Sequence, residues 1–267
     1  MFIRTNNVFR SSILDLPSVA HAFSTRLGGV SDNPDTASMN VAPGRGDSPD
    51  TVRRNTDILA QTVGCTAADC VCAHQVHSEM IRFVTESDRG LGIDRVNDMD
   101  CDGFYTDRRG VMLTVRTADC TPILLAGLRS DGTPAIAAVH AGWRGASLGI
   151  AFNAVTFLTY LGLKPEDIRA AIGPRASFED FEVGEDMRDE VRRTAGTNIA
   201  DKYIREAGGR LHADVGGINR EFLLLAGVAE DHIDVSPDST VSQPELFHSH
   251  RRTGERRGAM GNVIVIK

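Results

Sequence analysis

The clearest hydrophobic pattern lies in the middle of the chain. An apolar run over Ala135–Val139 is typical of a buried strand, and it ends at His140. Gly142 and Gly145 then indicate a sharp turn, and over residues 146–161 apolar side chains recur at a helical spacing. The pattern predicts a strand, a glycine turn and one helix, with His140 at the carboxyl end of the strand. Sheet proteins often bind ligands at the carboxyl ends of their strands. The backbone N–H groups at the start of the following helix favour binding of an anion. A histidine that is hydrogen-bonded in a tight turn and has no function would give the same sequence pattern.

The rest of the chain alternates short apolar segments with a few helical ones. Expected strands lie within residues 1–23, within 71–84 with an interruption at 74–78, after 100–103, and over 111–115, 123–126, 167–172 and 262–266. Expected helices cover residues 49–63, 185–194 and 219–226, the first with Ser48 as its N-cap residue and Gly64 at its end. Residues 195–210 are polar, and we expect a mobile segment there.

These elements favour the α+β class. We expect a single domain over residues 1–267, in which mixed β-sheets pack together and are flanked by helices, because the sequence contains neither a strong internal repeat nor a linker. The functional pocket is expected at the ends of the strands.

Composition narrows the class of partner. The 267 residues carry a net charge of −7, which argues against nucleic-acid binding because phosphate contacts need an excess of Lys and Arg. No apolar run approaches the length of a membrane span, and the first seven residues lack the apolar segment of a signal peptide. We therefore expect a cytoplasmic protein with small-molecule substrates and with neither nucleic-acid nor membrane partners.

The cysteines and histidines offer candidate chemistry. Five cysteines, an odd number, favour free thiols or metal ligands over a set of disulfides. Cys120 lies between apolar segments in a kinked Thr-Ala-Asp-Cys-Thr-Pro stretch, where a buried core thiol is the plain alternative. His77 begins a His-Ser-Glu stretch that matches the His-x-Glu of zinc nucleobase deaminases, but the companion Pro-Cys-x-x-Cys is absent from the sequence.

Three segments, taken in order, resemble the laccase-domain family. They are Gln75–Ser78, Thr117–Cys120 and Val139–Gly145. The family is also called the polyphenol oxidase family or the multicopper-like purine nucleoside phosphorylases. Further similar segments are residues 23–31, Asn40, Gly46–Asp47, the helix up to Asn55, Ile172–Pro174, Phe181–Gly184 and Phe247–Arg252. The resemblance covers nearly the whole chain.

The resemblance implies a metal held by His77, Cys120 and His140, which would also be the catalytic residues. Two imidazoles and a thiolate suit Zn²⁺, with Cu²⁺ as the alternative, and three protein ligands leave a fourth position for water or substrate. Asp119 and Gln75 are candidates for orienting these ligands, although they can equally serve local turns.

The family resemblance also implies an activity. Members cleave purine nucleosides with phosphate and deaminate adenosine to inosine, so adenosine, inosine and methylthioadenosine are the expected substrates. Candidate phosphate contacts are Arg26, Arg54 and Arg144, and Asn40 is carried over as a binding residue with its motif.

Three departures from the family pattern concern the expected substrate side. Asn55-Thr56 stands where the family usually has Asn-Arg, so Arg53 or Arg54 would have to supply that guanidinium. Ser239-Thr240 replaces a usual Cys-Thr, and residues 248–252 read His-Ser-His-Arg-Arg in place of Phe-Ser-Tyr-Arg-Arg.

Three other functions stay open at this point. A copper-dependent polyphenol oxidase would need clustered histidines, and the eight in this chain are scattered. A cysteine-type hydrolase acting on peptidoglycan precursors would use Cys120 as nucleophile and His140 as base. A nucleoside-binding module without catalysis is compatible with the altered C-terminal motif.

Overall fold

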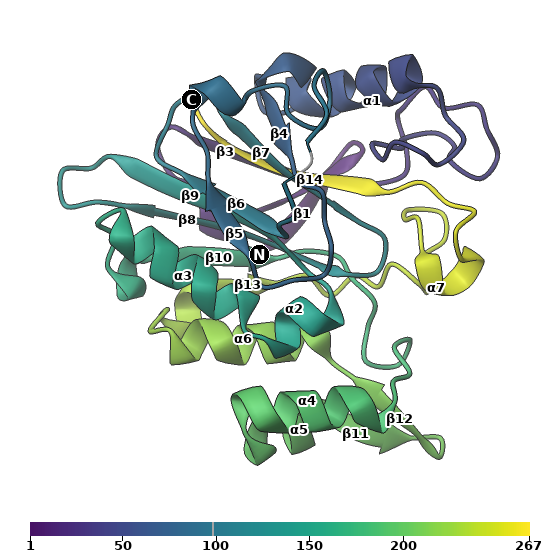
Figure 1. Ribbon diagram of the computed structural model, residues 1–267, viewed down its shortest axis with the longest axis vertical. Helices are drawn as coiled ribbons and strands as arrows, with labels where there is room; N and C mark the ends of the chain where they lie inside the picture. The colour runs from purple at the N-terminus through teal and green to yellow at the C-terminus, as the bar shows by residue number, and fades with distance from the viewer. Residues whose placement is uncertain (98) are drawn as a thin grey trace.

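Two six-stranded sheets lie face to face in the computed structural model, which describes residues 1–97 and 99–267 (Figure 1). The strand order of the first sheet is β1 (Phe2–Thr5), β2 (Val8–Ser11), β3 (Val19–Ser24), β14 (Met260–Ile266), β7 (Met112–Thr117) and β4 (Cys70–Cys72). The order of the second is β13 (Ile233–Val235), β10 (Arg169–Ile172), β8 (Thr121–Leu128), β9 (Pro134–Ala141), β6 (Gly103–Thr106) and β5 (Ile81–Phe83). Both sheets are mixed, because the pairs β4–β7, β5–β6 and β10–β13 are parallel and the others antiparallel.

Helices cover the outer faces of the two sheets (Figure 1). Helix α1 (Pro49–Gln61) packs on the first sheet, and α2 (Trp143–Ser147), α3 (Ile150–Tyr160) and α6 (Val215–Leu225) pack on the second. Beyond these lie α4 (Glu185–Ala195), α5 (Thr197–Tyr203) and the hairpin β11 (Ile204–Ala207) and β12 (Arg210–Ala213), while α7 (His250–Thr253) precedes β14. The predicted α+β class, with packed mixed sheets flanked by helices, is confirmed. Among the described residues, no helix is both long and apolar enough to cross a membrane.

The layers follow from the alternation of side chains along each strand. Leu113 on β7 and Leu124 on β8 are fully buried between the two sheets. Ile123 and Leu125, one residue to either side of Leu124, point instead to the helices on the outer face. Because β8 and β9 are covered on both faces, their sequences are continuous apolar runs, which is why the sequence alone reveals them clearly.

The helix beginning at Ser48 was predicted correctly, whereas the single helix over residues 146–161 was wrong. The Ser48 side chain accepts a hydrogen bond from the backbone N–H of Thr51, and Pro49 occupies the first turn. The other segment is broken into α2 and α3 at Gly149, which has a φ of +81°. A Cβ atom there would lie 3.2 Å from the ring of Phe222 on α6, so glycine permits both the break and the close packing.

Two further segments differ from the sequence-based expectation. Residues 195–210, expected to be mobile, form α5 and most of the β11–β12 hairpin, which buried Ala200 and Ile204 anchor to the neighbouring helices. Helix α6 begins four residues earlier than expected, because the Asp214 side chain accepts from the N–H of Gly217 and caps it. The strand expected over residues 71–84 is two strands in different sheets, joined by a crossover over residues 73–80.

Candidate metal centre

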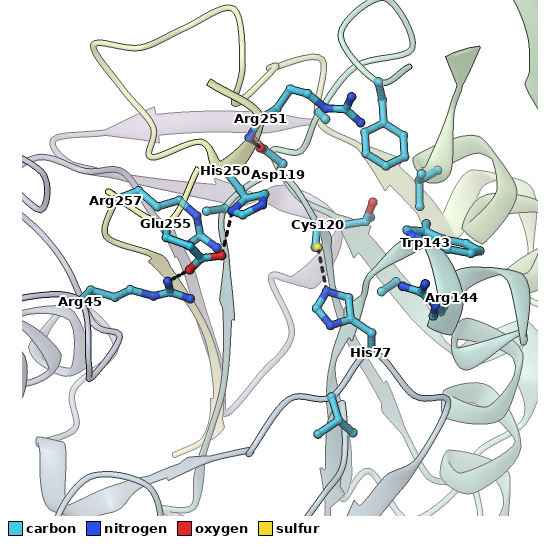
Figure 2. A pocket seen from close by; sticks show the side chains of 17 residues that line it. Arg45, His77, Asp119, Cys120, Trp143, Arg144, His250, Arg251, Glu255 and Arg257 are labelled. Atoms are coloured by element: carbon cyan, nitrogen blue, oxygen red, sulfur yellow. Dashed lines mark hydrogen bonds and ion pairs between the residues drawn. The ribbon is translucent and has the colours of Figure 1, made fainter. Parts of the chain in front are cut away.

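Three side chains from distant parts of the chain converge where strands end. His77 lies on the crossover between β4 and β5, Cys120 on the connection between β7 and β8, and His140 near the end of β9. Their potential ligand atoms all lie within 4.8 Å of one another. Nε2 of His77 is 3.7 Å from Sγ of Cys120, and Figure 2 shows the imidazole pointing at the sulfur. The two imidazole rings meet edge to face, with centroids 4.9 Å apart.

Asp102 fixes the orientation of His140. This carboxylate is fully buried at the start of β6, and its Oδ1 lies 2.8 Å from Nδ1 of His140. Because a carboxylate accepts, Nδ1 carries the hydrogen and Nε2 is left for a metal or for Cys120. Burial opposes ionisation of Asp102, but the hydrogen bonds from His140 and Ser78 hold its pKa below the usual value.

The same carboxylate holds the loop that carries His77. It accepts hydrogen bonds from the backbone N–H groups of Val76, His77 and Ser78, at 3.2, 3.0 and 2.6 Å, and from the Ser78 hydroxyl. His77 has a φ of +63°, an uncommon conformation for a residue with a side chain. The hydrogen bonds to Asp102 stabilise this turn and so aim the imidazole at Cys120.

The two glycines after His140 allow α2 to approach this loop. A Cβ atom on Gly142 would lie 2.2 Å from Cδ2 of His77, and one on Gly145 would lie 2.6 Å from the carbonyl oxygen of Ser78. Both distances are too short for a side chain. The Gly-Trp-Arg-Gly segment is therefore required for close packing against the His77 loop, in addition to its role as a turn.

The protonation states of Cys120 and His140 depend on each other. Burial alone would raise the pKa of the Cys120 thiol, but His140 and His77 lower it to about 6. Burial alone would lower the pKa of His140, but the charge of Cys120 and the hydrogen bond to Asp102 raise it to about 9. Near neutral pH, the metal-free pair is therefore a thiolate beside an imidazolium, and a metal would have to displace the proton of His140.

Asp119 and Gln75, the candidates for orienting the ligands, make their hydrogen bonds elsewhere in the described part of the chain. Asp119, with a φ of +89°, accepts from the side chains of Thr240 and Ser249 and from the N–H of Arg251, and so ties the C-terminal segment to the residue before Cys120. Gln75 exchanges two hydrogen bonds of 2.8 Å with the backbone of Arg116 on β7. Asp102 is the carboxylate bonded to His140, and the only signal for it in the sequence is its place just before a strand.

The cluster opens into a cavity of about 880 Å³. His77, Cys120 and the predicted residues Asp119 and Arg144 line this cavity. Five other ionisable residues line it, namely Arg45, His250, Arg251, Glu255 and Arg257. His250 and Arg251 belong to the 248–252 segment expected on the substrate side, whereas Arg45, Glu255 and Arg257 were not singled out from the sequence. Their signal in the sequence is weak, because isolated charged residues in loops are common.

The cavity has an aromatic side and a basic side (Figure 2). On the aromatic side, the guanidinium of Arg144 lies 4.3 Å from the centre of the Trp143 ring system, and that of Arg251 lies 4.8 Å from the ring centre of Phe181. On the basic side, Figure 2 shows Arg45 and Arg257 close to Glu255 and His250.

Three predicted binding residues lie outside the cavity lining. Arg26 donates to the backbone carbonyls of Ala37 and Pro244 and so holds loops together. Asn40 is buried, and its amide bonds to Asp47 and to backbone groups of neighbouring loops. Arg54 is exposed on α1, the helix that covers the outer face of the first sheet. The structure thus brings Arg144, but not Arg26 or Arg54, to the candidate site.

Comparison with known proteins identifies the family. The family model described as multi-copper polyphenol oxidoreductase laccase matches residues 20–267. The chain belongs to this family. It is 36% identical to a purine nucleoside phosphorylase of Deinococcus radiodurans over 92% of this chain and 89% of that protein. It is also 36% identical to the purine nucleoside phosphorylase YlmD of Geobacillus stearothermophilus, over 90% of this chain and 86% of that protein.

Solved structures of relatives share the fold. The crystal structure of YlmD from Geobacillus stearothermophilus has a TM-score of 0.88 at 32% identity, covering 100% of this chain and 98% of that one. The hypothetical protein YfiH of Bacillus licheniformis has a TM-score of 0.90 at 30% identity, covering 100% and 99%. The described residues of this laccase-family chain contain one group of three or more side chains placed to hold a metal, the His77–Cys120–His140 cluster.

The departures from the laccase-family pattern have distinct places in the fold. His248 is buried, and its Nε2 donates to the carbonyl of Met39, at 3.0 Å. In the Ser239-Thr240 pair the residue that differs is Ser239, which is buried and donates its hydroxyl to Asp180. Thr240, which matches the usual pattern, donates to Asp119 and so supports the connection that carries Cys120. His250 lines the cavity. Of these three differing residues, only His250 is placed to contact a substrate directly.

Proposed function

We propose that this protein is a zinc-dependent purine nucleoside phosphorylase that acts on adenosine, inosine or methylthioadenosine and also deaminates adenosine. The observation that carries the proposal is a three-donor cluster that opens into a cavity with an aromatic side and a basic side. The names of the Deinococcus and Geobacillus relatives support the phosphorylase activity. Zinc, deamination and the choice of nucleoside rest on the chemistry of the site and on the family resemblance.

The donor set fits zinc. Two imidazole nitrogens and a thiolate within 4.8 Å of one another match a three-ligand catalytic zinc site, and Asp102 supplies the carboxylate that commonly supports a ligating histidine. When bound, zinc would supply a Lewis acid with one position left for water or substrate. Copper is the alternative metal, because imidazole and thiolate suit it as well.

The lining residues can orient a purine nucleoside for phosphorolysis. Trp143 and Phe181 offer apolar faces for the base, while the cavity arginines offer charge for phosphate. In the reaction, the bond between C1′ of the ribose and N9 of the purine breaks and a bond from C1′ to a phosphate oxygen forms. The purine leaves with the bonding electron pair and takes up a proton. In deamination, water adds at C6 of adenine and ammonia leaves.

A cysteine-type hydrolase is the second candidate, because the Cys120 thiol is ionised near neutral pH. Its pKa of about 6, beside two imidazoles, is typical of an activated nucleophile. A thiolate that binds a metal cannot at the same time attack a substrate. Slow alkylation of Cys120 in protein as purified, becoming fast after chelation, is expected for a metal ligand, whereas fast alkylation in both states supports the hydrolase.

The test of the proposed function combines metal analysis with turnover. Protein purified without added metal is analysed for zinc and copper and then incubated with adenosine, with and without phosphate. Inosine and ammonia report deamination, and adenine with ribose 1-phosphate reports phosphorolysis. The same assay on His140→Ala should show neither reaction. Absence of turnover of adenosine, inosine and methylthioadenosine by the zinc-loaded protein would reject the proposal.

A further inference from the structure

The cavity carries an excess of positive charge in a protein that is negative as a whole. Four guanidinium groups and two carboxylates line it, whereas the full chain has a net charge of −7. Both oxygens of one carboxylate, Asp119, already accept hydrogen bonds from the C-terminal segment. Glu255 is therefore the lining carboxylate that faces the arginines, and the balance of charge favours an anionic ligand.

Glu255 lies among basic groups on the wall that faces Cys120. We define the Glu255 cluster as Arg45, His250, Glu255 and Arg257 (Figure 2). The Glu255 carboxylate forms an ion pair with Arg45, and its Oε1 lies 3.7 Å from Nδ1 of His250. Arg45, then His250 and Arg257, lower the pKa of Glu255. Nε of Arg257 is buried without a hydrogen-bond partner among the described residues.

A carboxylate in this position resembles a bound oxyanion. Carboxylate and phosphate present similar oxygen pairs to a guanidinium, which is why arginine binds both. The Glu255 side chain is 72% exposed and that of Arg45 is 28% exposed, so the carboxylate has room to move away from the guanidinium. If Glu255 moved out, the three basic groups would be left facing the cavity without a counter-charge from it.

We propose that Arg45, His250 and Arg257 form a binding subsite for inorganic phosphate, and that Glu255 occupies this subsite until phosphate displaces it. The inference rests on the proposed function for the identity of the anion. It locates phosphate at the basic side of the cavity, opposite Trp143, with Cys120 and His77 between them (Figure 2). Glu255 then acts as an internal competitor that weakens phosphate binding.

The test is titration calorimetry with inorganic phosphate on the full chain as purified, without nucleoside. Glu255→Gln is expected to bind phosphate about 5-fold to 10-fold more tightly than the unchanged protein, because the competing charge is gone. Arg45→Ala and Arg257→Ala are each expected to weaken binding at least 10-fold. The chain offers a matched control pair in Arg220 and Glu230, an ion pair remote from the cavity, with side chains 27% and 77% exposed. Arg220→Ala and Glu230→Gln should leave the phosphate affinity unchanged.

The outcomes separate this subsite from the proposed function. Phosphate binding that strengthens in Glu255→Gln and weakens in Arg45→Ala supports the subsite even if no nucleoside is turned over. Turnover of nucleoside with a KM for phosphate that is the same in all three cavity variants and both control variants overturns the subsite while the phosphorylase stands. A third arm uses adenosine 5′-monophosphate: if it alone responds to Glu255→Gln, the subsite binds an esterified phosphate and the inference about inorganic phosphate is wrong.

Discussion

At the scale of single residues, Asp102 connects two of the three candidate metal ligands, His77 and His140. One of its oxygens accepts from Nδ1 of His140 and from the N–H of His77, and the other accepts from Val76 and Ser78. These hydrogen bonds offset the desolvation cost of burying the carboxylate, because both of its oxygens have donors. Asp102 thus positions both imidazoles without contacting a substrate.

Replacing this carboxylate should therefore loosen metal binding. We expect Asp102→Asn to lower zinc affinity about 10-fold to 100-fold, because the amide cannot stabilise the imidazole and accept from the loop as a carboxylate does. Competition with a chromogenic chelator measures the affinity. Asp100→Asn is the matched control, since Asp100 pairs with His74 and both side chains are 62% exposed. Equal affinities in the two variants would show that Asp102 does not support the ligands.

The sequence motifs predicted the three candidate metal ligands but not Asp102, the carboxylate that orients two of them. His77, Cys120 and His140 are 43 and 20 residues apart and were found through ordered motifs, not through any local spacing. Asp102 has no motif of its own, and its role depends on a hydrogen bond across 38 residues that only the fold creates. Asp119 was the more prominent acid because it adjoins Cys120, yet its oxygens bind the C-terminal segment.

At the scale of elements, the short helix α2 and the His77 loop are packed too closely for any side chain between them. Gly142 has a φ of −62° and a ψ of 162°, which alanine can also adopt. A substitution there therefore tests the contact and not the backbone conformation.

We expect Gly142→Ala to displace the His77 ring, since the new Cβ would lie 2.2 Å from its Cδ2. Zinc affinity should fall at least 10-fold. Circular dichroism should show unchanged secondary structure, which separates a displaced ligand from a misfolded chain. Retention of the original zinc affinity by the folded variant would contradict the close contact.

The elements that could be predicted were those whose capping residues or apolar pattern indicate the same structure along the whole element. Helix α1 has a capping serine, a proline and an amphipathic face, and β9 is apolar up to His140. The break at Gly149 was missed because the apolar spacing continues across it, and only packing against Phe222 distinguishes two helices from one. Likewise, β4 and β5 have only three residues each, too few for their patterns to show that they belong to different sheets.

At the scale of the whole molecule, buried polar groups join the two sheets away from the cavity. Ser11 on β2 donates its backbone N–H to Nε2 of His21 on β3, at 2.9 Å, and its hydroxyl to Asp234 on β13 of the second sheet. Burial is the main cause that lowers the pKa of His21 to about 4. The folded protein therefore holds this imidazole neutral.

Stability should consequently fall in acid. Below pH 6.5 the unfolded chain protonates His21, while the folded chain resists until about pH 4, so the unfolded state binds more protons and the free energy of unfolding decreases as the pH falls through this window. The loss from this residue is about 3 kcal/mol between pH 7 and 4. Urea unfolding at both pH values should show a smaller loss in His21→Gln, which keeps an acceptor for Ser11. An equal loss in both proteins would exclude His21 as a cause.

The position of the candidate metal centre has a mechanical consequence. The chain leaves the first sheet for the second at β4–β5 and again at β7–β8, and each of these passages carries one donor, His77 and Cys120. A cation bound there by His77, Cys120 and His140 would cross-link the two sheets of the sandwich. Local opening of the β-sandwich at this seam would move His77 or Cys120 away from the ion, so the lifetime of the loaded state would depend on that opening as well as on the strength of the three bonds.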